Sequence, residues 1–173
     1  ARNLGLEMIY EKVKPFTLAI IVGLLGFLFS ILALRSPGFM GVAMAAIVIM
    51  VGLEVLGMTL RVMISGRAPV TNMYETVMWA GFGGFVLSAI LGLKWKDARV
   101  WACGFAGNSI CLFMMNFASG MLDPAIQPLV PVLRDNFWLS THVTSVTFSY
   151  GCFFLSWVVA NYVMLRWIVS GPS

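Results

Sequence analysis

The residue best suited to metal chemistry in this sequence is its only histidine, His142. It lies one helical turn after Trp138, at the start of a long apolar run. One imidazole is too few ligands for a structural metal site, but it can supply one axial ligand to a heme iron, and Trp138 could stack on the porphyrin. A second axial ligand would come from Met114 or Met115, another segment or another chain. The alternative is a histidine that only hydrogen bonds to solvent or a loop carbonyl at a membrane interface.

A second polar cluster occupies residues 66–76, with the sequence GRAPVTNMYET. Asn72 is placed to cap a helix, and Glu75 follows three residues later, where the carboxylate of a capping box belongs. The planar guanidinium of Arg67 suits an anionic ligand group such as a propionate. The cluster is therefore either a well-formed helix start or the rim of a binding site that includes Arg67, Asn72 and Glu75.

Glu54 is a carboxyl group inside an apolar run. Such residues cost free energy in a bilayer and usually face a cavity or a partner, which makes Glu54 a functional candidate. The alternative is that Arg61 or the membrane interface solvates it. A transporter with Glu54 in its path predicts inverted repeats, and their absence from the sequence disfavours that function.

The composition is that of a membrane protein. Of the 173 residues, 60% are hydrophobic and 10% are charged, and the mean hydropathy is +0.93, whereas soluble domains carry about 25% charged residues. The net charge of +4 is scattered, so we expect no nucleic-acid partner. The three cysteines form no Cys-x-x-Cys pair, which disfavours a zinc site. Without a Cys-x-x-Cys-His signature the chain is not itself a c-type cytochrome.

Five apolar stretches are long enough to cross a bilayer, which takes about 20 residues. They predict an all-α, polytopic membrane protein with a single transmembrane helical domain over residues 16–173. The first fifteen residues mix charged and apolar side chains, which predicts an interfacial segment over 1–15. The predicted spanning helices are 16–34, 39–60, 73–93, 100–121 and 138–165.

Small and polar residues within the predicted helices indicate helix–helix contacts. Asn108 and Asn116 are two turns apart and can hydrogen bond between helices. Glycines in a membrane helix allow close approach of a neighbour. The glycines expected to do this are Gly81, Gly83, Gly84, Gly104 and Gly107.

The basic residues give a weak orientation signal. The densest group is Lys94, Lys96 and Arg99, in the short loop between the third and fourth predicted helices. Short loops rich in lysine and arginine favour the cytoplasmic side. This orientation places the loops around 61–72 and 122–141, and with them His142, at the outer face.

Two segments resemble one known family. Residues 66–76 are similar to the pattern Gly-x-x-Pro-Leu-Ser-Asn-Leu-Tyr-Glu-Ser. Residues 131–150, PVLRDNFWLSTHVTSVTFSY, are similar to the pattern Pro-x-Leu, then Trp-Leu-x-x-His-Val, then Ser/Gly-Tyr. Both patterns, in this order and separated by two helices, are typical of the CcsA/ResC-type proteins of System II cytochrome c biogenesis. The resemblance covers about residues 61–165.

The resemblance implies a protein that presents heme b, as a transient ligand, at the outer face of a bacterial inner or thylakoid membrane for thioether attachment to apocytochrome c. It leaves open whether the chain is part of a holocytochrome c synthase, or heme lyase. His142 matches the first of two outer-face histidines that flank the family's tryptophan-rich WWD heme-binding segment. Trp138 would line the porphyrin, and Arg67, Asn72 and Glu75 would shape the rim.

The sequence departs from the family pattern because it contains no Trp-Gly-x-x-Trp-x-Trp-Asp stretch and no second histidine. We expect the N-terminal portion of a longer protein, or one half of a split protein, that works with a WWD-containing portion or a CcsB/ResB-like partner. The rival interpretation is a structural membrane subunit of a redox complex that carries no heme of its own.

Overall fold

The computed structural model describes residues 4–66, 70, 72–117, 122 and 136–170, and in this part of the chain it contains helices and no strand. Five helical segments are long and apolar enough to cross a membrane. The prediction of an all-helical, polytopic membrane protein is therefore confirmed. The elements are α1 Leu4–Val13, α2 Pro15–Ala33, the 3-10 turn η1 Pro37–Phe39, α3 Met40–Ser65, α4 Met73–Trp95, α5 Ala98–Phe117, α6 Asn136–Trp138, the π-helical η3 Leu139–Val143 and α7 Thr144–Ser170.

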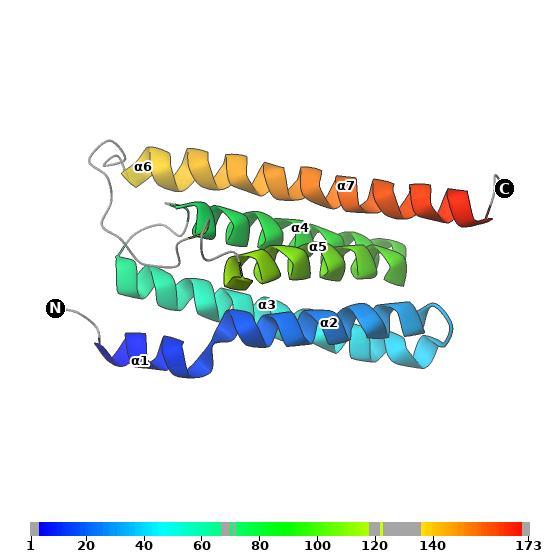
Figure 1. Cartoon of the computed structure of the whole chain (residues 1–173), viewed down its shortest axis with the longest axis horizontal. Coiled ribbons are helices and arrows are strands. Elements are labelled where there is room, and N and C mark those ends of the chain that lie inside the picture. Colours follow the sequence, from blue (N-terminus) through cyan, green and yellow to red (C-terminus); the bar gives the residue numbers. More distant parts are fainter. Residues whose placement is uncertain (1–3, 67–69, 71, 118–121, 123–135, 171–173) are drawn as a thin grey trace.

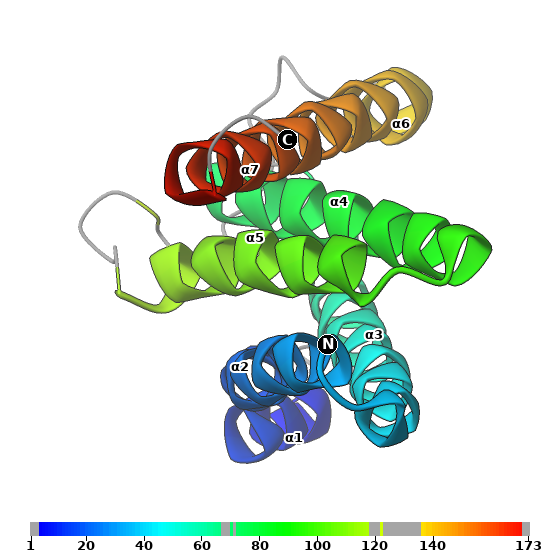
Figure 2. The same ribbon diagram turned by 90° about the vertical axis from the view of Figure 1, so that its right-hand side faces the viewer.

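The spanning helices form an elongated bundle with α5 near its centre (Figures 1 and 2). Helix α5 packs against α2 on one side and α4 on the other, and 61% of its spanning segment is buried. Helix α7 lies on the outside of α4, and only 6% of its spanning segment is buried. One end of the bundle collects α1, the last turn of α3, the first turn of α4, the last turn of α5, and α6 with η3. We call this the His142 end.

A backbone break separates α1 from α2. Lys14 has φ 45° and ψ 58°, in the left-handed region, and Pro15 follows as the first residue of α2. Proline disfavours a right-handed helical conformation in the residue before it, so one continuous helix through Lys14 is prevented. Helix α1 contacts α3 and exposes Leu4, Met8 and Ile9. These exposed apolar side chains agree with an interfacial position, which stays a prediction.

Glycines set the close crossing of α4 and α7. A Cβ atom at Gly84 would lie 2.7 Å from the carbonyl oxygen of Gly151, and one at Gly151 would overlap the carbonyl oxygen of Ala80. These neighbours are backbone atoms, which cannot rotate away as a side chain can. Each of the five glycines singled out in the sequence faces a neighbouring helix at close range, Gly84 at a backbone atom and the other four at side-chain atoms. Their predicted role in close helix approach is confirmed.

Replacing Gly151 with alanine is expected to lower the free energy of unfolding by about 1–3 kcal/mol, because overpacking forces the two helices apart. Thermal unfolding in detergent measures the loss. Gly52 is the matched control, because it is also inside a long helix but a Cβ atom there would meet nothing within 4 Å. Gly52→Ala should leave stability unchanged or raise it by up to ~1 kcal/mol. Equal effects of the two substitutions would rule out a tight α4–α7 crossing.

Candidate functional site

Asn72 fixes the start of α4 at the His142 end. Its backbone is extended, and its Oδ1 atom accepts a hydrogen bond of 2.8 Å from the backbone N–H of Glu75. The hydroxyl of Thr76 donates to the carbonyl oxygen of Asn72 at 2.9 Å. The predicted helix cap is therefore confirmed. Asn72 holds the first turn of α4 in place and is half-buried.

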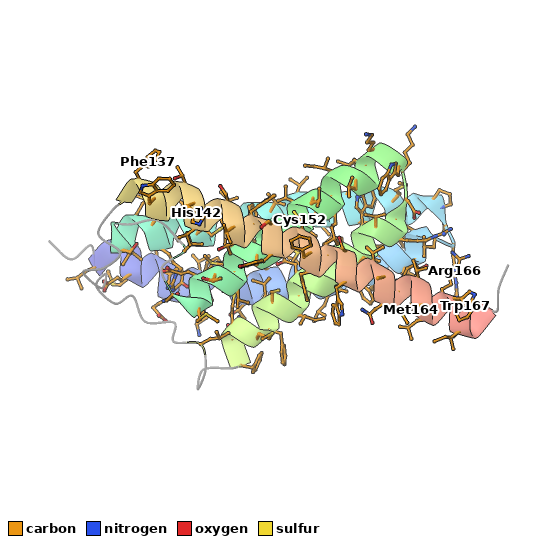
Figure 3. All side chains as sticks on the ribbon, turned by 90° about the horizontal axis from the view of Figure 1, so that it is seen from above. Phe137, His142, Cys152, Met164, Arg166 and Trp167 are labelled. Atoms are coloured by element: carbon orange, nitrogen blue, oxygen red, sulfur yellow. The ribbon has the colours of Figure 1, made fainter. Side chains whose placement is uncertain are left out.

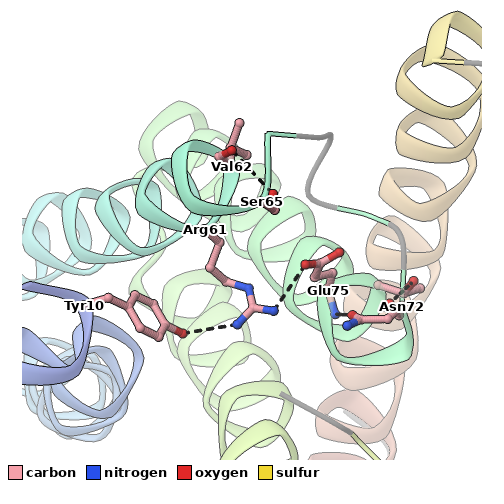
Figure 4. Close-up of polar contacts among 7 residues, drawn as sticks. Tyr10, Arg61, Val62, Ser65, Asn72 and Glu75 are labelled. Atoms are coloured by element: carbon pink, nitrogen blue, oxygen red, sulfur yellow. Dashed lines mark hydrogen bonds and ion pairs between the residues drawn. The ribbon is translucent and has the colours of Figure 1, made fainter. Parts of the chain in front are cut away.

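The carboxylate of Glu75 pairs with Arg61 of α3 (Figure 4). Arg61 Nη2 lies 3.2 Å from Glu75 Oε1, and each side chain is 2% exposed. Arg61 Nη1 donates a hydrogen bond of 3.4 Å to the hydroxyl oxygen of Tyr10. Its guanidinium also lies 4.7 Å from the centre of the Tyr74 ring, in cation–π geometry. This buried cluster ties α1, α3 and α4 together.

Arg61 and Tyr10 are the residues of this cluster that the sequence analysis missed. The predicted second span ended at Leu60, with Arg61 as a flanking charge, whereas α3 continues through Arg61 to Ser65. The signal was the apolar run Val62–Ile64 after Arg61, together with an acidic residue at the start of the next span. Because the side chain of Glu75 is buried against Arg61, it faces the interior of the bundle at this end. The predicted rim residue Arg67 lies outside the described residues.

His142 and Trp138 are brought together on one turn at the start of the last helix. Their ring centres are 6.3 Å apart with an interplanar angle of 75°. His142 lies within the π-helical segment Leu139–Val143, and π-helical turns are rare and frequent at functional sites. Trp138 is 62% exposed and His142 is also exposed (Figure 3). The imidazole is therefore accessible to a ligand that approaches from outside the bundle.

A hydrogen bond between helices joins the two predicted groups of site residues. The indole N–H of Trp79, one turn after Glu75, donates to the carbonyl oxygen of Thr144 at 3.0 Å. Thr144 follows His142 by two residues, so the Asn72-capped helix α4 supports the turn that carries the imidazole. Asn72 and Glu75 are thus linked to His142 indirectly, through helix α4 and the hydrogen bond from Trp79.

His142 belongs to no multi-residue metal site in the described part of the chain. Within the described residues, no group of three histidine, cysteine, aspartate or glutamate side chains could hold a metal ion. Met115 is 2% exposed in the core, and Met114 lines an apolar groove of about 340 Å³ between α2 and α5. Neither His142 nor Trp138 lines that groove or the pocket of about 220 Å³ beside Tyr10 and Tyr74. The arrangement suits one axial bond to the iron of an exposed porphyrin.

Glu54 lies inside the bundle, away from this end. Its side chain is fully buried, and Asn108 Nδ2 of α5 donates to its Oε1 atom at 2.6 Å. The alternative of a solvated carboxylate near the interface is therefore wrong. The predicted contacts of the two asparagines are confirmed, because Asn108 reaches α3 and Asn116 accepts a hydrogen bond of 3.5 Å from Thr17 of α2.

Comparison with known proteins identifies relatives of the chain, although no family model matches it. NrfI of Wolinella succinogenes is 32% identical over 125 residues, which are 70% of this chain and 13% of that protein. The cytochrome c biogenesis protein CcsA of Guillardia theta is 31% identical over 99 residues, which are 56% of this chain and 32% of that protein.

A longer match joins this chain to CcsA of Parasynechococcus marenigrum, which is 26% identical over 158 residues, or 87% of this chain and 52% of that protein. The chain therefore spans about half or less of the length of these relatives. The chain is an integral membrane protein, because it has five helices that are long and apolar enough to span a membrane and its relatives include CcsA proteins. The predicted resemblance is confirmed: the chain is a homologue of the CcsA-type cytochrome c biogenesis proteins.

Proposed function

We propose that the chain is a heme-handling membrane component of cytochrome c maturation, which presents heme b at the outer face of a bacterial inner or thylakoid membrane. The observation that carries this proposal is the exposed pair of His142 and Trp138 at the start of the last spanning helix, in a segment that matches the family pattern. The relatives named for cytochrome c biogenesis support the biological process.

In this proposal each residue has a defined task. One nitrogen of His142 binds the iron of the transient heme as an axial ligand. Trp138 covers part of the porphyrin with its exposed indole ring. Asn72 and Glu75 act indirectly, because they fix the first turn of α4, which supports Thr144 and the turn beside it. Arg67 would contact a propionate at the rim.

Heme held in this way would be attacked by the two thiols of an apocytochrome Cys-x-x-Cys-His segment. Each thiol adds across one vinyl group, so that sulfur bonds to carbon and the thiol proton is transferred to the vinyl group. The chain would accelerate these additions by proximity and orientation, since fixing two reactants removes much of the entropic cost of their encounter. His142 holds the porphyrin for this step, and the reacting thiols come from the apocytochrome.

The last helix leaves room for further partners. Only a small part of α7 is covered by other helices, and Tyr150, Phe153 and Trp157 are exposed along it. These side chains can face the bilayer or other membrane helices. We propose that a WWD-containing portion or a CcsB/ResB-like partner packs near the same end and completes the heme site, since the described residues supply one ligand.

A structural subunit without heme is the second candidate. The observation that favours it is that, within the described residues, no group of three metal-ligating side chains includes His142. In that case His142 is an exposed polar residue, and the buried Arg61–Glu75 pair would serve only to stabilise the fold.

Complementation tests the proposal. In the source organism, removal of this chain should abolish covalent heme in c-type cytochromes, which heme staining of denatured proteins detects. Wild type and the control Thr141→Ala, a change at the exposed neighbour of His142, should restore the stain, whereas His142→Ala should not. Full restoration by His142→Ala would favour the structural subunit. Normal cytochromes c after removal would contradict a role in their maturation.

A further inference from the structure

Glu54 and Asn108 form an isolated polar pair in the interior of the bundle. Glu54 is 0% exposed and Asn108 is 2% exposed. The amide N–H of Asn108 donates to Glu54 Oε1 at 2.6 Å, which joins α3 to α5. Nothing in the proposed heme function requires a carboxyl group at this place.

Each side chain has one buried oxygen without a partner, and these two oxygens bear on the protonation state of Glu54. Glu54 Oε2 and Asn108 Oδ1 are both buried and have no hydrogen-bond partner within the described residues. An ionised carboxylate and an amide oxygen are both acceptors, so they cannot bond to each other. A protonated carboxyl group gains one O–H donor. One proton on Oε2 therefore supplies a donor for the unpaired amide oxygen on the residue that already bonds to Glu54.

The charges around Glu54 leave no cation to balance a carboxylate. Helix α2 has no titratable side chain. On α3 itself, Arg61 is two turns away and is paired with Glu75. On α5, Cys111 carries a thiol, which supplies no positive charge. The remaining titratable groups on the neighbouring helices are Glu7, Tyr10, Glu11 and Lys12 on α1, Tyr74, Glu75 and Lys94 on α4, and Arg99 and Cys103 on α5. Lys12 is exposed. Along their helices, Arg99 is about 14 Å from Asn108, and Lys94 is about 20 Å from Gly81, the residue of α4 that faces Asn108.

An ionised Glu54 would therefore be a buried charge without a basic partner among the described residues, which is strongly unfavourable in an apolar interior. A bound metal cation fits poorly. A Cβ atom on Gly81 would lie 2.7 Å from Asn108 Oδ1, so the backbone of α4 closes over the amide oxygen. The cavity beside Asn108 is about 10 Å³, the space of a single water molecule at most.

We propose that Glu54 is a proton-binding site within the membrane, where the neutral carboxylic acid and Asn108 form a reciprocal acid–amide pair between α3 and α5. The acid O–H donates to Asn108 Oδ1, and the amide N–H donates to the acid carbonyl oxygen. The proton comes from water when the chain folds and is retained at neutral pH.

Infrared difference spectroscopy of the purified full chain in H₂O and D₂O tests the proposal. The spectrum of wild type minus the spectrum of Glu54→Gln, both at neutral pH, should show one C=O band of a protonated carboxyl group, and this band should shift in D₂O. Wild type minus Glu11→Gln, a change at an exposed carboxyl, should show carboxylate bands. Carboxylate bands in the Glu54→Gln difference would overturn the proposal.

Stability measurements separate a proton from a metal cation. Glutamine can replace the acid in the reciprocal pair, because its amide offers both a donor and an acceptor. The melting temperature of Glu54→Gln should match wild type, and wild type should melt equally in sodium and choline chloride. Sodium-dependent stabilisation of wild type that Glu54→Gln lacks would show a cation site and overturn the proposal. If Glu54→Gln does not fold, the spectrum of wild type alone tests the proposal. A D₂O-sensitive C=O band at neutral pH, where ordinary carboxyl groups are ionised, supports it, and the lack of that band overturns it.

Discussion

Replacing His142 with alanine is expected to weaken heme binding by about tenfold or more, which corresponds to ~1.4 kcal/mol. The reason is that His142 is the only imidazole in the chain and the described residues around it offer no other ligand cluster. Titration of the purified protein with hemin in detergent, followed by absorbance, measures the affinity. The Soret band of the heme bound to wild type should be lost or shifted in the variant, because its iron loses the imidazole ligand.

Two controls separate ligation from folding. Thr141→Ala changes an exposed neighbour on the same π-helical turn and should bind hemin as wild type does. Added imidazole should return the Soret band of His142→Ala toward its wild-type position, because a free ligand can occupy the position of the lost side chain. Unchanged hemin affinity in His142→Ala would contradict the assigned ligand.

The largest expected effect on stability comes from breaking the Arg61–Glu75 pair. Arg61→Met leaves the carboxylate of Glu75 buried without its partner guanidinium, and loss of one member of such a pair costs about 3–5 kcal/mol. Thermal unfolding in detergent should therefore show a strongly lowered melting temperature. The loss should include detachment of α1, since Arg61 also donates to Tyr10.

The matched control is the exposed ion pair between Arg99 Nε and Asp97 Oδ1, at 3.7 Å with side chains 46% and 38% exposed. Asp97→Asn should cost less than about 1 kcal/mol. The double variant Arg61→Met with Glu75→Leu should recover part of the stability, because apolar side chains can replace a buried pair. A loss for Arg61→Met as small as that for Asp97→Asn would show that the buried pair contributes little.

The number and type of the spanning helices could be predicted because each apolar run is long and is bounded by charged residues, proline or glycine. Asn72 could be predicted as a cap for a similar local reason, since a cap and the N–H it binds are three residues apart. Such features depend on neighbours in the sequence. They do not require knowledge of which helices touch.

The buried ion pair could not be predicted in the same way. Arg61 and Glu75 are 14 residues apart on different helices, so their contact depends on how α3 and α4 rotate about their axes. The same holds for Glu54 and Asn108, which are 54 residues apart. The apolar run after Arg61 indicates that the helix continues past it, but it does not indicate which residue the guanidinium contacts. His142 could be predicted as a candidate ligand because it is the only histidine in the sequence. The hydrogen bond from Trp79 to Thr144, which supports its turn, is a tertiary contact and could not be predicted.

The central claim, that His142 binds the heme iron, is tested most directly by isotopic labelling. Because the chain has a single histidine, growth with ¹⁵N-histidine labels only His142, provided that the purification tag contains no histidine. Pulsed electron paramagnetic resonance of the hemin-loaded ferric protein then distinguishes an axial ¹⁵N from the ¹⁴N atoms of the porphyrin. The account predicts ¹⁵N coupling to the iron in the labelled protein. A signal from bound ferric heme without ¹⁵N coupling would contradict it.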